Sequence, residues 1–400
     1  MGEGLSMVAL EYGKNRLTLE LGTGQLIAAH HGPAPLSDPA DAVATALEKP
    51  FDYPALRLAL TPDDHVTVVV DVPGLDSAAL LVPVLENLTA AGLAPQAITL
   101  LVERESAGWI DDLPDHLDEV HVEGHSSAER TRLAYLATTK KGRRLYLNRT
   151  LVESDQVVVL TQRRYDAVTG YAGGAASLFP TFSDEPTLQE VARTCHLEPP
   201  GDAPWPWLQE ANEVAWLLGQ PFYVQLIPAA GGGVSAVLAG AGEALAEGQR
   251  ALDRGWRVQV PRRADCVVAA VSGKHVSFAE LASAAWNACR VVRPGGRVVL
   301  LHEGSPPPDA TLEQLTRYDD AQEGLSAMEK AGATISPTAR TWARAVSHAR
   351  VSLLGRLDPQ LVEDLSATPL EKASQVQRLV AGSGECILLQ DAQTSLALLA

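Results

Sequence analysis

Residues 65–103 read HVTVVVDVPGLDSAALLVPVLENLTAAGLAPQAITLLVE, and this stretch decides the fold class. Residues 65–71 form a nearly continuous β-branched run that ends in an acid, which is typical of a strand buried on both faces. A helix capped by Asp76 or Ser77 follows, and residues 98–103 form the next strand. Strand, helix and strand in this order predict a parallel sheet covered by helices.

The same order of elements recurs in the last third of the chain. Residues 266–271, CVVAAV, predict a buried strand, and residues 277–292 predict a helix. After the turn RPGG, residues 297–302, RVVLLH, predict another strand. A second sheet of the same kind is therefore expected.

We predict an α/β protein of two α/β domains with largely parallel sheets, residues 1–262 and 263–400. Ligands bind open α/β sheets at the carboxyl ends of the strands. An interdomain cleft is therefore expected at the ends of strands 65–71, 98–103 and 156–161.

Composition excludes several classes of function. The 400-residue chain has a formal net charge of −17 at pH 7, whereas nucleic-acid binding requires clustered Lys and Arg. The four cysteines form no C-x-x-C pair, and the ten histidines form no metal-binding pattern. No apolar run approaches the roughly 18 residues of a membrane helix. We expect a cytoplasmic protein with no nucleic-acid or membrane partner and no metal, and the sequence does not indicate its oligomeric state.

A glycine-rich segment, GYAGGAASLFPT at residues 170–181, follows the strand 156–161. Adjacent glycines beyond a strand allow a close backbone approach, so Gly173 and Gly174 predict a tight turn with positive φ at the cleft floor. The neighbouring Ala175 and Ala176 carry no reactive group.

Several sequence segments, in the same order along the chain, resemble those of the nickel-dependent lactate racemases and their 2-hydroxyacid racemase and epimerase relatives. They are EYGKNRLTLEL (11–21), DPADAVATALEKP (38–50), HVTVVVD (65–71) and LAYLATTKKGRRLYLNRTLVESDQVVVLT (133–161). The last of these is the most specific, and the resemblance covers nearly the whole chain. It implies two α/β domains and a site between them.

The resemblance also implies a cofactor that this chain is not equipped to hold. Family members carry a G-F-S-G-G-x-K segment whose lysine joins a nickel-pincer nucleotide through a thioamide. Gly170, Gly173 and Gly174 match this segment, but the lysine position is Ala176. We therefore expect no cofactor, and we regard Gly173, Gly174 and Asp71 as vestiges of its site.

The other groups that the family uses are also replaced. The histidine positions that the resemblance implies fall on Ala107, on Tyr165 or Asp166, and near Trp207 and Leu208. Asp71 is retained, whereas the arginine expected three residues later is Gly74. Two substrate-contacting positions of the second domain fall on Glu280 and Ser283.

Three hypotheses for the function follow. The first is a non-racemising homologue that binds a small ligand, such as a carboxylate, in the interdomain cleft. The second is a rebuilt, metal-independent enzyme acting on a hydroxy acid or related carboxylate. Its candidate catalytic residues are Arg164, Tyr165, Asp166 and Glu280, with Glu103, Glu105 and Arg163 nearby. The third is a family racemase whose site is displaced.

Overall fold

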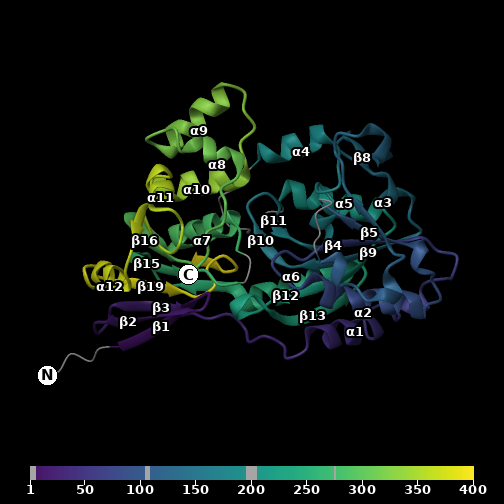
Figure 1. Ribbon diagram of the computed structural model, residues 1–400, viewed down its shortest axis with the longest axis horizontal. Coiled ribbons are helices and arrows are strands. Elements are labelled where there is room, and N and C mark those ends of the chain that lie inside the picture. Colours follow the sequence, from purple (N-terminus) through teal and green to yellow (C-terminus); the bar gives the residue numbers. More distant parts are fainter. Residues whose placement is uncertain (1–5, 104–108, 195–204, 274–275) are drawn as a thin grey trace.

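The computed structural model describes residues 6–103, 109–194, 205–273 and 276–400. They form two lobes, each built on a six-stranded sheet (Figure 1). The first sheet has the order β13-β12-β9-β4-β5-β6 and the second β18-β17-β16-β15-β19-β3. Every strand pair in these sheets is parallel except β12 with β13. The predicted fold class is confirmed.

The first sheet is covered on both faces by apolar side chains. Its strands are β4 (Val66–Asp71), β5 (Ile98–Val102), β6 (His121–Gly124), β9 (Gln156–Gln162), β12 (Phe222–Pro228) and β13 (Val234–Gly240). Helices α1 (Pro39–Glu48) and α2 (Ser77–Ala90) pack on one face. The other face packs against α3 (Arg149–Glu153), α5 (Pro206–Leu217), the short helix η6 (Gly174–Ser177) and the hairpin β7 (Leu133–Thr138) to β8 (Arg144–Asn148). The short helix α4 (Glu185–Ala192) follows η6 in the chain. The side chains of β9 alternate between the two faces, as the period of a strand requires.

The second sheet is also buried on both faces. Its strands are β3 (Leu26–His30), β15 (Ala264–Ala270), β16 (Val292–Leu301), β17 (Arg350–Leu354), β18 (Thr368–Leu370) and β19 (Cys386–Leu389). One face packs against α7 (Phe278–Val291), α8 (Ala310–Leu315), α9 (Ala321–Lys330), α10 (Pro337–His348) and α11 (Pro359–Asp364). The other packs against α12 (Ala373–Ala381) and the hairpin β1 (Ser6–Tyr12) to β2 (Asn15–Leu21).

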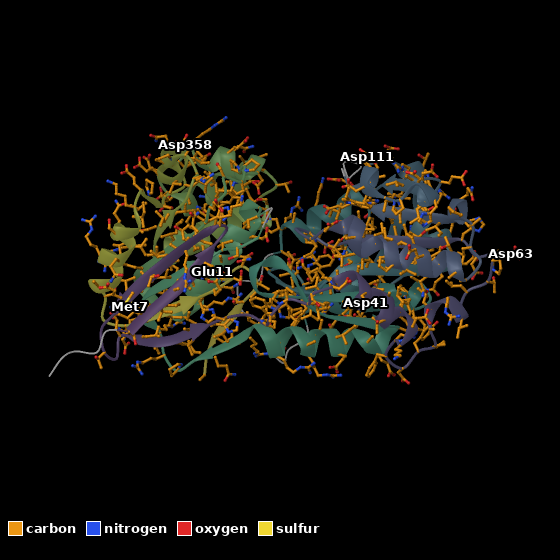
Figure 2. All side chains as sticks on the ribbon, turned by 60° about the horizontal axis from the view of Figure 1, so that its bottom comes forward. Met7, Glu11, Asp41, Asp63, Asp111 and Asp358 are labelled. Carbon is orange, nitrogen blue, oxygen red and sulfur yellow. The ribbon has the colours of Figure 1, made fainter. Side chains whose placement is uncertain are left out.

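The start of the chain belongs to the second lobe, which corrects the predicted division at residue 262. Strand β3 pairs in parallel with β19, and Leu19 and Leu21 of β2 belong to the same buried apolar cluster as Val268 of β15. Figure 2 shows Met7 and Glu11 on the same lobe as Asp358. An amphipathic strand pattern indicates which face is buried but not which sheet buries it, so the sequence could not reveal this arrangement.

The chain therefore crosses between the lobes twice, after β3 and again after α6 (Gly242–Trp256). The crossings touch: a Cβ on Gly32 would lie 2.1 Å from the Trp256 ring, and one on Gly255 would lie 3.2 Å from Pro33. After the second crossing, β14 (Arg257–Val260) pairs with β20 (Leu396–Leu399). Glycine at residue 32 is required by this close approach.

Among the described residues, no helix combines the length and the apolar character needed to span a membrane.

We expect Leu19→Ala to lower the free energy of unfolding by about 2–5 kcal/mol, because it removes a fully buried side chain between the hairpin and the second sheet. Urea unfolding followed by tryptophan fluorescence measures the change. Met7→Ala is the matched control in the same hairpin, where the side chain is 65% exposed and the expected change is within about 0.5 kcal/mol. Equal midpoints for both variants would show that the hairpin is not part of the cooperative unit.

Candidate functional site

A cavity of about 320 Å³ lies between the two lobes, and we call it the interdomain cavity. One wall comes from the segments that follow β4 and β9, residues 73–75 and 162–166. The other comes from residues 272–273 after β15 and from the start of α7, residues 276–283. The cavity therefore lies at the carboxyl ends of parallel strands, where α/β proteins bind ligands.

The candidate residues Arg164, Tyr165, Asp166 and Glu280 all line the interdomain cavity. Gly74 and Ser283, where the resemblance implies substrate-contacting groups, line it as well. Glu103 is exposed and is not part of the lining. Glu105 and Ala107 lie outside the described residues.

Asp71 organises the polar groups at the end of β4. Its carboxylate accepts hydrogen bonds from Arg164 Nη2 at 2.9 Å, Ser177 Oγ at 2.6 Å and Thr161 Oγ1 at 3.2 Å. Burial disfavours the charge of Arg164, but Asp71 outweighs this effect and raises the pKa of Arg164 above its ordinary value. The sequence missed Thr161, although it lies opposite Asp71 in the register of two parallel strands. Asp71 and Arg164 therefore form an ion pair beside the interdomain cavity.

Tyr165 and Tyr171 anchor the small hairpin β10 (Arg164–Asp166) to β11 (Gly170–Ala172) onto α6. Their hydroxyls donate to the Asp253 carboxylate at 2.8 Å and 2.9 Å. Burial and the neighbouring Asp253 raise the pKa of Tyr165 and raise that of Tyr171 to about 12. Both hydroxyls are therefore protonated donors at neutral pH. No sequence pattern indicated Asp253, which lies 88 residues from Tyr165.

Asp166 closes the turn of that hairpin. Its Oδ1 accepts from the backbone N–H groups of Val168 and Thr169, both at 2.7 Å, and from Thr169 Oγ1 at 3.0 Å. An aspartate that hydrogen-bonds the backbone two residues later forms an Asx turn. One carboxylate oxygen is thereby occupied by local structure.

Glu280 has a similar local role at the start of α7. Its Oε2 accepts from the backbone N–H and the Oγ of Ser277, while the Ser277 hydroxyl accepts from the Glu280 N–H. This reciprocal arrangement is a capping box. It stabilises the helix terminus that borders the interdomain cavity.

The predicted positive φ is confirmed, at +81° for Gly173 and +62° for Gly174, but neither glycine lines the interdomain cavity. A Cβ on Gly173 would lie 2.5 Å from the carbonyl oxygen of Gln162, and one on Gly174 would lie 2.6 Å from Arg163 Nη1. The Gly174 N–H donates to Thr161 Oγ1 at 3.2 Å. Backbone geometry and lack of space therefore both require glycine here.

These residues do not fit the cofactor attachment that the resemblance implies. Ala176 lies in η6, is buried, and offers a methyl group where an amine is needed. Leu208 packs beside Tyr171 in an apolar cluster. Within the described ranges, no three His, Cys, Asp or Glu side chains are placed to hold a metal ion.

Comparison with known proteins finds similarity to the lactate racemases. Residues 12–199 match the family described as the lactate racemase N-terminal domain. The structure of the lactate racemase apoprotein from Thermoanaerobacterium thermosaccharolyticum superposes with a TM-score of 0.78 at 14% identity, covering 98% of this chain and 100% of that chain. A Thermotoga maritima crystal structure superposes with a TM-score of 0.67 at 12% identity, covering 92% and 100%. No curated protein matches in sequence. The predicted resemblance is confirmed.

We expect Gly173→Ala to destabilise the protein by several kcal/mol, because it combines a positive φ with a Cβ pressed against the Gln162 carbonyl. Gly142→Ala is the matched control: its φ is +85°, and nothing lies within 4 Å of the added Cβ. It should cost only the conformational strain of about 1–2 kcal/mol. Urea titrations of both variants measure the difference, and equal losses would contradict the close approach.

Proposed function

We propose that this chain is a non-racemising homologue of the lactate racemases that binds a small carboxylate in its interdomain cavity. Its residues 12–199 match the lactate racemase N-terminal domain, and its fold is that of a lactate racemase. The observation that carries the proposal is Ala176. It stands where the resemblance implies a lysine that tethers the cofactor.

Racemisation by hydride transfer, the route that the resemblance implies, needs a hydride acceptor and bases on two sides of the substrate. No amino-acid side chain accepts a hydride, so the reaction depends on the cofactor. The buried methyl group of Ala176 has no nitrogen for a thioamide link. This argument supports a protein that does not racemise lactate.

The arrangement of the acidic groups favours binding over a rebuilt enzyme. A general base needs a carboxylate that reaches the substrate. Asp166 Oδ1 holds the turn at Thr169, and Glu280 Oε2 holds the N-terminus of α7. Asp71 accepts hydrogen bonds from Arg164 and Ser177. These groups support the walls of the cavity rather than proton transfer.

The lining suits a small polar acid. The Arg164 side chain is 36% exposed and supplies a cation beside the cavity, although Asp71 neutralises part of its charge. Ser277, Ser283 and Thr394 add hydroxyl groups. A volume of about 320 Å³ accommodates a molecule of a few carbon atoms. A hydroxy acid with its carboxylate near Arg164 and its hydroxyl groups toward α7 fits this distribution.

Purified protein co-expressed with the enzymes that make the nickel-pincer nucleotide should carry no covalent nucleotide and no stoichiometric nickel. It should also leave each lactate enantiomer unchanged. Intact-mass spectrometry, elemental analysis and chiral chromatography measure these three properties. The T. thermosaccharolyticum lactate racemase, expressed in the same cells, is the positive control. An added mass that matches the nucleotide, or about one nickel per chain, would contradict the proposal.

A second measurement tests the ligand itself. Small hydroxy acids such as lactate, glycerate and malate should bind, and Ser283→Trp should abolish binding by filling the interdomain cavity. Ala327→Trp, on the exposed side of α9, is the matched control and should leave affinity unchanged. Isothermal titration calorimetry provides the affinities. If Ser283→Trp leaves them unchanged, the ligand does not bind in this cavity.

A further inference from the structure

A second cavity, of about 450 Å³, lies between α5, α6 and η6. Of the residues that line it, only Arg163 also lines the interdomain cavity. Its walls are largely apolar, from Ala175, Leu208, Ala215, Trp216, Leu245 and Ala246. The polar side chains of Asn212, Gln220, Glu243 and Gln249 complete the lining.

Arg163 lies in this lining and is only 3% exposed. Its Nη1 donates to the carbonyl of Gly173 at 2.8 Å, so this nitrogen has a hydrogen-bond partner. Its Nε is buried without a hydrogen-bond partner. Burial, with the nearby charge of Arg164, lowers the pKa of Arg163 to about 10, so the side chain is still a cation at neutral pH. A buried charge is normally paired.

No carboxylate of the described chain forms an ion pair with Arg163. Asp253 is the acid that acts on it electrostatically, but its oxygens accept from Tyr165 and Tyr171 and it lies 3.6 Å from Arg257. Glu243 of the lining is exposed to water, where its charge is screened. The inner end of the cavity therefore has an excess of positive charge.

Tyr223 supplies a second unused donor in the same lining. Its side chain is fully buried, and its hydroxyl has no hydrogen-bond partner. Burial raises the pKa of Tyr223, so the hydroxyl stays protonated and can donate. Leaving such a group unpaired costs about 1–3 kcal/mol, and an unpaired group of this kind requires an explanation.

We propose that the second cavity binds a small carboxylic acid with an apolar body. The carboxylate accepts hydrogen bonds from Arg163 and Tyr223, and the hydrocarbon part packs against Leu208, Leu245 and Trp216. A carboxylate supplies the missing counter-charge and accepts from two donors at once. A phosphate would bring more negative charge than one guanidinium balances in this apolar setting. This site is independent of the one proposed between the lobes.

Calorimetric titration with hexanoate and benzoate tests the proposal, with hexanamide and benzamide as neutral probes of the same shape. The carboxylates should bind at least about tenfold more tightly than the amides, because a hydrogen bond to a charged group is the stronger kind. Equal affinity for acid and amide, or no binding of the acids at millimolar concentration, would overturn the proposal.

Tyr223→Phe removes only the hydroxyl group and should weaken hexanoate binding about tenfold. Without ligand it should not lower the melting temperature, because the lost hydroxyl has no partner. Tyr171→Phe is the matched control: it loses a hydrogen bond to Asp253, so it should lower the melting temperature. Unchanged hexanoate affinity in Tyr223→Phe would contradict the assignment of this hydroxyl.

Two further variants distinguish this site from the interdomain cavity. Ala246→Trp places a large ring at an exposed position of the second cavity and should block hexanoate. It should leave the affinity for hydroxy acids unchanged. Ser283→Trp should block the hydroxy acids and leave the affinity for hexanoate unchanged. Loss of hexanoate binding in Ser283→Trp alone would move the acid to the interdomain cavity and overturn this proposal while leaving the other intact.

Discussion

The contact between Gly173 and the end of β9 is the constraint on which both cavities depend. The backbone of the glycine turn lies so close to the Gln162 carbonyl that no side chain fits at Gly173. The turn is held there by Thr161, which accepts from the Gly174 N–H, and by Arg163, which donates to the Gly173 carbonyl. Both consecutive arginines that follow line the interdomain cavity, and Arg163 lines the second cavity as well. Arg164 pairs with Asp71 beside the interdomain cavity, while Arg163 reaches the second cavity.

One fold can support different chemistries, since packing and catalysis make different demands on the chain. Here the glycines are required sterically whether or not a cofactor is bound, because Gln162, Arg163 and Leu245 surround them. Asp71 is likewise held by Ser177 and Thr161 within the chain. Resemblance to the family at these positions therefore indicates a shared backbone geometry. The chemistry has to be judged from the side chains themselves, such as the buried methyl group of Ala176.

The sequence predicted the local features of the site better than its long-range contacts. The strand, helix and strand of residues 65–103 and the positive φ at Gly173 both follow from patterns within a short window. The spacing of Ser277 and Glu280 is that of a capping box, so the local role of Glu280 was also visible in principle. The bond from Tyr165 to Asp253 and the pairing of β3 with β19 join distant segments. Such contacts depend on tertiary packing, which periodicity does not encode.

The double crossing of the chain has a mechanical consequence. Two connections that touch at Gly32 and Trp256 join the lobes at one place. Pulling the lobes apart there would strain both connections at once, so the two chain segments together oppose a change in the separation of the lobes. Residues of both lobes line the interdomain cavity, so a small molecule that contacts both walls would add a third link between the lobes.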